Sequence, residues 1–411
     1  MSANSLPVAG MADQIELAWH KAVVAAEGSA CISVAVHHRI ADVEAPWRAL
    51  STSIDSPGQN YDFIRLWVEN RKIPEDSQVY VVGRVGGEPI AILPLHRKRV
   101  FGIRVFTWFP GSHAGCYAPV ADTARLAAMG AEGRAALWRQ MLGSVKGAGL
   151  AYLRSIPASV DGQDGLFDQL GSSLAVDTLY RVQFSSWEQC DAEQRSRSRR
   201  KHDRQQGDRL AALGAVDFEE ISDPAEAQKA LAIMFEQRSA RFRAQGIHDP
   251  FVAENLIGFY SAALERSSGV DVRLHALRLD GEIVAVRYNV VHGDRMFCLI
   301  SSMSDCERIQ GGSPGKQCLL RVMQTVFGQG IAIFDMGCGY TDEKRHWCNV
   351  QIPLRHHYVG LSPVGKAVAL AHRSYQRLRA QAKSNDRIKG ALRALKQQRD
   401  RLLRREASDQ L

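Results

Sequence analysis

The sequence predicts an α/β fold with a mixed sheet, built from two tandem units of one type and followed by a basic helical tail. Three observations carry this prediction. Short hydrophobic runs at tight-turn spacing lead into a glycine-rich loop and a helix, the same order of elements occurs twice, and residues 366–405 carry a net charge of +11. With 411 residues the chain is also too long for one ordinary core.

The second half of the chain shows the pattern most clearly. Hydrophobic runs at residues 272–279, 283–291 and 296–302 are separated by Asp280-Gly281 and by His292-Gly293-Asp294, which are turn signals. The run Arg308-Ile-Gln-Gly-Gly-Ser-Pro-Gly-Lys316 then opens an apolar helix that reaches residue 326. A strand follows at 331–336. Upstream we expect a basic helix at 194–213, a strand at 216–220, and helices at 224–245 and 252–266.

The first half repeats this order. We expect a strand at 34–40, helices at 43–53 and 60–71, strands at 78–84, 89–100 and 104–109, a loop at 111–123, a helix at 125–146 and a strand at 150–156. Gly87-Glu-Pro-Ile-Ala-Ile92 aligns with Gly281-Glu-Ile-Val-Ala-Val286, and residues 150–156 align with 331–336. Several elements that match in order indicate an internal duplication.

The repeat divides the chain into four parts. They are a loose leader at 1–30, a first unit at 31–175, a second unit at 176–365 and a basic helical tail at 366–411. A rough apolar stripe in the tail fits two situations. The helix can dock on its own domain, or it can lie on an anionic membrane or polymer.

Composition limits the class of protein. The apolar fraction of 45% and the charged fraction of 23% are those of a soluble globular protein, and no run of about 18 apolar residues predicts a membrane span. The eight cysteines form no C-x-x-C pair, which favours free thiols in a reducing cytoplasm and no metal site. We therefore expect a cytoplasmic protein, with peripheral contact at the inner membrane surface as an extension of the basic tail.

Charge is unevenly distributed along the chain. Of the net +8, residues 366–405 carry +11 and residues 194–204 carry +5, so the remainder sums to −8. This asymmetry suggests an anionic partner, such as nucleic acid, a membrane surface or a phosphorylated substrate. The alternative is that the charges only form solvated helix faces.

The glycine-rich loop is the strongest functional signal. Glycines let backbone N–H groups approach an anion, and the positive end of the helix dipole favours its charge. The pattern therefore predicts a pyrophosphate site, for which a plain turn before a Pro-started helix is the alternative. The predicted cofactor residues are Gln310, Gly311, Gly312, Ser313, Gly315 and Lys316.

The order strand, hairpin, strand, glycine-rich loop, helix, strand resembles the GNAT acyltransferase fold, and two such units in tandem resemble the Fem-type aminoacyl transferases. The closest likeness is to the bacterial group with a BioF2-like acetyltransferase domain, which includes the cellulose-biosynthesis CelD-like proteins. It is carried by Ser313-Pro-Gly-Lys316, Phe334-Asp-Met-Gly-Cys-Gly339 and Glu343-Lys-Arg-His-Trp347. Where the group has Tyr before the Lys, this chain has Glu343, and Tyr340 lies four residues before Lys344.

The resemblance implies an acyl-CoA co-substrate, acetyl-CoA or another, and direct transfer to an amine or hydroxyl. Glu343 is the first candidate base and Asp335 the second, while Lys344 would stabilise an oxyanion or a substrate phosphate and Tyr340 would act as an acid. The alternatives are that Asp335 caps a turn and that Glu343 pairs with a neighbouring cation. The first unit lacks the compact glycine run, so we expect it to contribute to acceptor binding rather than to bind CoA.

Three functions remain open from the sequence. The first is an N- or O-acyltransferase that acts on a small-molecule or glycan acceptor, namely a sugar, sugar nucleotide or exopolysaccharide precursor. The second is a Fem-like transferase that takes an aminoacyl group from tRNA. The third is a non-catalytic interaction protein of a polysaccharide synthesis system.

Overall fold

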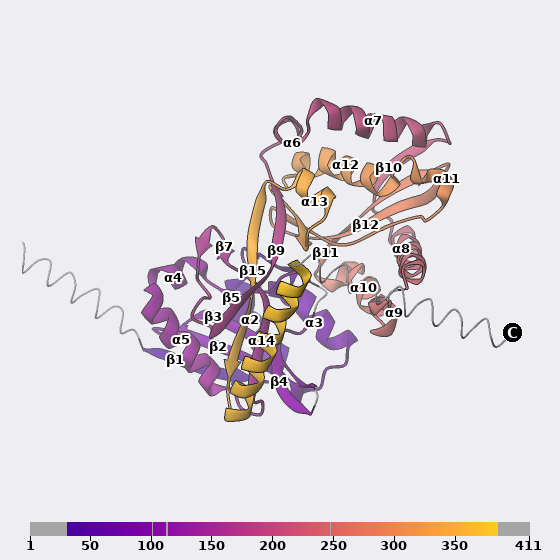
Figure 1. The fold of residues 1–411 in the computed structure, drawn as a ribbon. Coiled ribbons are helices and arrows are strands. Elements are labelled where there is room, and N and C mark those ends of the chain that lie inside the picture. The colour runs from indigo at the N-terminus through magenta and orange to yellow at the C-terminus, as the bar shows by residue number, and fades with distance from the viewer. Residues whose placement is uncertain (1–30, 101, 112–113, 247, 385–411) are drawn as a thin grey trace, which may run out of the picture.

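A computed structural model describes residues 31–384 except residues 101, 112–113 and 247 (Figure 1). The predicted leader at 1–30 and the end of the predicted tail, residues 385–411, lie outside the described residues.

One continuous mixed sheet runs through the described chain (Figure 1). Its first six strands in spatial order are β1 (Ile32–His37), β2 (Gln78–Val85), β3 (Glu88–Val100), β4 (Ile103–Thr107), β6 (Leu150–Pro157) and β15 (Val350–Gly360). The next six are β9 (Ser172–Gln183), β14 (Ile333–Cys338), β13 (Arg295–Met303), β12 (Glu282–His292), β11 (Asp271–Leu279) and β10 (Val216–Ile221).

The two halves of the sheet mirror each other. In each half an antiparallel meander leads into one parallel pair, β4 with β6 and β13 with β14. The predicted α/β fold of two tandem units is therefore confirmed. The halves also exchange strands, because β15 belongs to the second unit in sequence but pairs with β6 of the first, and β9, which begins in the first unit, pairs with β14 of the second.

The predicted meander strands agree closely with the structure, because their turns are specified locally. Asp280 and Gly281 both have positive φ, +51° and +84°, which is the geometry of a tight two-residue hairpin. The two central strands β9 and β15 were not predicted. The predicted boundary between residues 175 and 176 falls inside β9.

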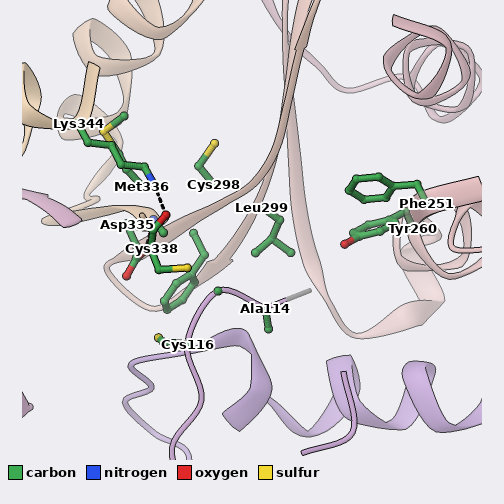
Figure 2. A pocket seen from close by; sticks show the side chains of 13 residues that line it. Ala114, Cys116, Phe251, Tyr260, Cys298, Leu299, Asp335, Met336, Cys338 and Lys344 are labelled. Atoms are coloured by element: carbon green, nitrogen blue, oxygen red, sulfur yellow. Dashed lines mark hydrogen bonds between the residues drawn. The ribbon is translucent and has the colours of Figure 1, made fainter. Parts of the chain in front are cut away.

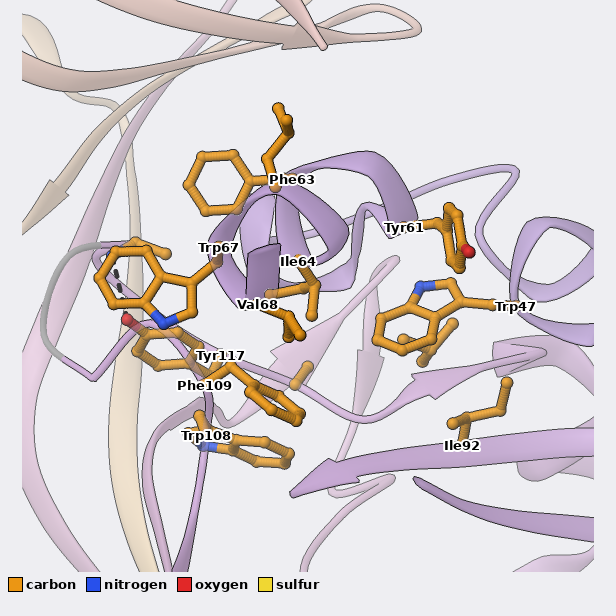
Figure 3. Close-up of a cluster of buried hydrophobic side chains, with 14 of the residues drawn as sticks. Trp47, Tyr61, Phe63, Ile64, Trp67, Val68, Ile92, Trp108, Phe109 and Tyr117 are labelled. Carbon is orange, nitrogen blue, oxygen red and sulfur yellow. Dashed lines mark hydrogen bonds between the residues drawn. The ribbon is translucent and has the colours of Figure 1, made fainter. Parts of the chain in front are cut away.

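The helices of the first unit are α2 (Glu44–Leu50), α3 (Tyr61–Asn70), α4 (Thr123–Ala128) and α5 (Gly130–Ser144). The last two correspond to one predicted helix, which the structure interrupts at Gly130, where φ is +66°. Aromatic rings dominate the core here (Figure 3). Trp47 is fully buried, packs edge-to-face on Tyr61 at 5.9 Å, and donates its indole N–H to Gln59 O at 2.7 Å. The buried aromatic rings stabilise this core, and the hydrogen bond of the Trp47 indole N–H removes the cost of burying that polar group.

The second unit carries helices on both faces of its sheet. They are α6 (Trp187–Gln194), α7 (Arg197–Ala211), α8 (Pro224–Ala244), α9 (Pro250–Ala253), α10 (Ile257–Ala263), α11 (Glu307–Gln310), α12 (Pro314–Val326) and α13 (Asp342–Trp347). The helix predicted at 252–266 is shorter than expected. Alternate residues of β12 face α8 and α12, so both helices bury apolar sides against one strand.

The basic tail begins as α14 (Pro363–Ser384), which lies along β15 and β6 (Figure 1). Ala369 packs with Val105, Leu150 and Tyr358, and Arg373 donates to Ser173 O at 2.7 Å. The described part of the tail is therefore docked on the protein. Among the described residues, no helix combines the length and apolar character needed to cross a membrane.

Candidate active site

A cavity of about 240 Å³ lies where β13 and β14 separate (Figure 2). The two parallel strands pair only from Arg295 to Phe297 and from Ile333 to Asp335, and then diverge. Figure 2 shows Lys344 and Asp335 on one side of the cavity and Phe251 and Tyr260 on the other. The cavity is lined by Ala114, Gly115, Cys116, Phe251, Tyr260, Phe297, Cys298, Leu299, Asp335, Met336, Gly337, Cys338 and Lys344. Both units therefore contribute to one site.

Asp335 lines this cavity, but both of its carboxylate oxygens are engaged. Oδ2 accepts from Arg181 Nε at 2.9 Å, and Oδ1 accepts from the backbone N–H of Gly337 at 2.7 Å. Arg181 also pairs with Asp55 of the first unit at 2.6 Å. Burial lowers the pKa of Arg181, yet the two carboxylates outweigh that effect and raise it. Asp335 therefore holds the end of β14 and joins the units.

Lys344 brings a cation to the wall of the cavity. Its ammonium group donates to Cys338 O and lies 5.9 Å from the ring centroid of Tyr180. The helix α13 positions it, and Thr341 begins that helix by accepting the Lys344 N–H on its side chain at 3.2 Å. An ammonium group held in this way can stabilise negative charge that develops inside the cavity.

Glu343 lies behind the cavity rather than in its lining. Its Oε1 is 3.4 Å from Nη2 of the buried Arg287, which in turn donates Nη1 to the Sγ of Cys298 at 3.7 Å. Cys298 lines the cavity, so a chain of three side chains connects Glu343 to it. Within the described residues, Oε2 of Glu343 has no hydrogen-bond partner, which leaves it able to accept a proton.

Tyr340 is not brought to the cavity. It is 62% exposed, and its ring meets the edge of Tyr180 with ring centroids 6.5 Å apart. Of the four predicted catalytic residues, the structure thus places Asp335 and Lys344 in the lining and Glu343 next to it.

The six predicted cofactor residues form the turn between α11 and α12. None of them lines the cavity among the described residues. The N–H groups of Gly312, Ser313, Lys316 and Gln317 are bonded within the turn. Of the described donors here, the N–H of Gly315 lacks an acceptor and the exposed Lys316 ammonium has no ion-pair partner. The Gly315 N–H and the Lys316 ammonium therefore fit the anionic group of a bound donor.

Helix α7 packs directly on this turn. Gln206 donates to the Oγ of Ser313 at 2.7 Å. A Cβ added to Gly312 would lie 2.8 Å from the Cβ of Leu210, so glycine is required for this close approach. Basic side chains of α7 lie on this side, with Arg197 and Lys201 exposed, and burial followed by the charges of Arg199 and Arg345 lowers the pKa of the nearby His346. The outer side of the loop is therefore both covered and basic.

Sequence reasoning missed the arginines that organise the site. Arg181 lies on the unpredicted strand β9, and Arg287 lies within an apolar run, where its position on β12 gives no local signal. The glycine turn at 337–339 signals the end of β14 but not its partners. Among the described residues, no group of three or more His, Cys, Asp or Glu side chains is placed to hold a metal ion.

Sequence comparison assigns part of the chain to a family. The sequence model described as "Acetyltransferase (GNAT) domain" matches residues 197–345, which include α7, the meander, the glycine-rich loop and Lys344. Comparison with curated proteins finds no significant match.

Solved structures resemble the fold. FemX matches at a TM-score of 0.54 and 12% identity over 82% of this chain and 100% of that chain. The C-terminal domain of a protein assigned as a lysylphosphatidylglycerol synthetase from Agrobacterium fabrum matches at 0.49 and 14%, over 81% and 95%. A tandem GNAT protein from the clavulanic acid biosynthesis pathway matches at 0.42 and 10%, over 81% and 99%. Residues 197–345 therefore carry a GNAT acetyltransferase domain, which supports an acyltransferase, and the described chain is built from two units of one type in tandem.

Proposed function

We propose that the protein transfers an acyl group, in the simplest case acetyl, from acyl-CoA to an amine or hydroxyl of a sugar, sugar nucleotide or exopolysaccharide precursor. The observation that supports this most directly is the cavity between β13 and β14, which holds Lys344 and is closed by a loop of the first unit. The glycan acceptor rests on the resemblance to BioF2-like acetyltransferase domains.

The residues of the chain take the following roles in this proposal. The acceptor attacks the thioester carbonyl of acyl-CoA directly, so that a C–N or C–O bond forms, the C–S bond breaks, and coenzyme A leaves as a thiolate that takes up a proton from solvent. The Lys344 ammonium stabilises the negative charge on the tetrahedral oxygen. Glu343 lies just behind the lining and accepts the proton of the acceptor through an intervening water, and Arg287 holds its carboxylate in place. Gly315 and Lys316 bind the anionic end of the donor.

A Fem-like transfer from aminoacyl-tRNA is the second candidate, and one observation favours it. Helix α7 covers the glycine-rich loop with a basic surface, where a larger anionic donor could bind. This donor would not need the loop N–H groups that are already bonded. The two candidates share the cavity and differ only in the donor.

Binding of acetyl-CoA tests the choice of donor. A specific ligand stabilises a protein by RT ln(1 + [L]/Kd), about 2.7 kcal/mol at a hundredfold excess over Kd. We expect acetyl-CoA to raise the thermal midpoint and an acceptor screen to release free thiol. Because Cys31 and Cys306 are exposed, reactions without acceptor provide the thiol background. No stabilisation by any acyl-CoA, together with binding of aminoacyl-tRNA, would favour the second candidate.

We also propose a cytoplasmic location, with the basic tail in contact with an anionic membrane or polymer. The net charge of +11 over residues 366–405 supports this.

A further inference from the structure

Two adjoining cavities, of about 440 and 690 Å³, form a groove along α14. They share Arg154 of β6, Val176 and Asp177 of β9, and Gln376 and Arg379 of α14, so they are continuous. The groove also reaches the candidate active site, since Gly115 and Cys338 line both the first of these cavities and the cavity that holds Lys344.

The groove follows β6 on the side that α14 covers, and residues of β9 and β15 complete its lining. The parallel strands β4 and β6 pair only at Val105–Phe106 and Leu150–Ala151, and then separate as β13 and β14 do. Tyr152 and Arg154 follow on β6 and line the groove. The groove therefore begins where β6 has separated from β4, and it meets the active-site cavity at Gly115 and Cys338.

The groove has an excess of positive charge. Three arginines line it, Arg154, Arg377 and Arg379, against the single carboxylate of Asp177, which gives a net charge of +2. The Asp177 carboxylate accepts the N–H of Thr178 at 2.8 Å. The two lining histidines do not add charge near neutral pH, because burial and then Arg154 lower the pKa of His356 to about 4, and the same causes lower the pKa of His372.

Arg154 is half-buried, yet among the described residues no carboxylate lies within ion-pair distance of it. Three buried arginines are paired with carboxylates: Arg181 with Asp55 and Asp335, Arg195 with Asp191 and Asp203, and Arg287 with Glu343. A partly desolvated guanidinium is costly without an anion, and its planar fork suits phosphate. Arg154 lines the groove without such a partner among the described residues, so its guanidinium is open to an anionic ligand there.

We infer that this groove binds the phosphate-bearing part of the acceptor, with Arg154 and Arg379 as its anion ligands. A phosphomonoester or diphosphate carries about two negative charges, which matches the net +2 of the lining. The ring of Tyr152 forms one wall, and the amine or hydroxyl of the acceptor reaches Lys344 past Gly115 and Cys338. The inference rests on the proposed acyltransferase function, and it names the class of acceptor.

Calorimetry with the full chain tests the groove. The probes are inorganic pyrophosphate and uridine diphosphate, titrated in saturating coenzyme A so that the donor loop is not available to them. We expect both to bind, and Arg154→Gln to weaken binding about 10- to 100-fold, the worth of a charge-assisted contact. Arg379→Gln should also weaken probe binding. Because Arg379 is exposed, this variant should stay folded, so the groove can still be tested if Arg154→Gln misfolds. Arg104→Gln, exposed on β4 and outside the groove, is the matched control and should change Kd by less than about twofold.

Probe binding that neither Arg154→Gln nor Arg379→Gln affects would overturn the inference. So would binding only to vesicles of phosphatidylglycerol and phosphatidylcholine, because the phosphate would then come from a lipid surface. Thiol release from acyl-CoA, measured on the same proteins, separates the two proposals. If no acyl-CoA is consumed while uridine diphosphate still binds through Arg154, the donor proposal fails and the groove stands. If acyl-CoA binds but neither probe does, the inference about the groove is wrong and the donor proposal is unaffected.

Discussion

Single residues of the candidate site differ in whether their partners are fixed. Asp335 has both oxygens engaged by Arg181 and Gly337, whereas Glu343 has one oxygen near Arg287 and one without a partner in the described chain. A carboxylate can accept a proton in catalysis only if the atom that receives it is accessible. The geometry therefore agrees with the order in which the sequence ranks the two candidate bases, Glu343 first and Asp335 second, because the oxygens of Asp335 are already occupied.

The first prediction follows from this difference. Glu343→Gln removes the proton acceptor but keeps the shape of the side chain, so we expect kcat to fall by about 10²–10⁴-fold with acyl-CoA affinity unchanged. Steady-state kinetics and calorimetry measure the two effects separately. Asp342→Asn, one residue earlier on α13 and exposed, is the control. An unchanged kcat would reduce Glu343 to the ion-pair partner of Arg287.

The second prediction concerns His357, which is 1% exposed on β15. Burial lowers its pKa to about 4, below the value of about 6.5 in an unfolded chain. Between these two pKa values the unfolded state binds a proton that the folded state does not bind. The free energy of unfolding therefore falls as pH drops from about 6.5 towards 4. Between pH 7.5 and pH 5 this group should cost roughly 2 kcal/mol.

Urea unfolding at both pH values measures the loss. The variant His357→Gln should show a pH dependence smaller by roughly that amount. The exposed His202 provides a matched variant, His202→Gln, which should keep the wild-type pH dependence. If His357→Gln and the wild type lose the same stability on acidification, His357 is not a source of the effect.

At the level of elements, local patterns and distant partners determine different parts of the structure. The strands β11, β12 and β13 are predictable because turn residues and apolar runs specify them within the segment itself. The strands β9 and β15 are not, because each is completed by the other unit: β15 pairs with β6 and β9 pairs with β14. Such exchange depends on residues more than a hundred positions away, which no local pattern encodes.

The glycine-rich loop shows the same division. Its place before α12 is predictable, but its cover by α7 is not, since that contact joins Gln206 to Ser313 across 107 positions. Sequence alone therefore identifies the loop and overstates the number of N–H groups that it offers to an anion. Only Gly315 among the described loop donors keeps its N–H available.

The third prediction tests the loop as an element. A Cβ at Gly315 would lie 3.1 Å from the Sδ of Met303, and a valine there would crowd the remaining N–H donor. We expect Gly315→Val to weaken CoA binding at least about tenfold while the protein stays folded. Gly328→Val is the control, because a Cβ there has nothing within 4 Å. A folded Gly315→Val protein with wild-type affinity in calorimetry would remove the loop from the donor site.

At the level of the whole molecule, the site depends on both units being held together. The buried network Asp55, Arg181 and Asp335 joins the first unit, β9 and β14, and Arg295 of β13 pairs with both Asp55 and Asp161. Breaking one partner of such a network leaves an unpaired buried charge, which is strongly destabilising. The duplication is thus more than a repeat of two independent folds, because residues of both units line the candidate active-site cavity and the groove.

The last prediction separates the two parts of the basic tail. Residues beyond 384 include eight Lys and Arg, while α14 packs Ala369 on the sheet and contributes Arg379 to the groove. A chain that ends at residue 384 should keep its thermal midpoint and its affinity for uridine diphosphate. It should lose affinity for anionic vesicles, most clearly at low salt, because screening limits the reach of exposed charges to about 8–10 Å at physiological salt.

A chain that ends at residue 361 should in addition unfold at a lower temperature, because Tyr358 and its apolar neighbours lose their cover, and should bind uridine diphosphate more weakly. Equal stability of the two truncated chains would mean that the docked helix contributes nothing to the fold, and equal vesicle binding by the full chain and the longer truncation would mean that the terminal charge serves only solubility.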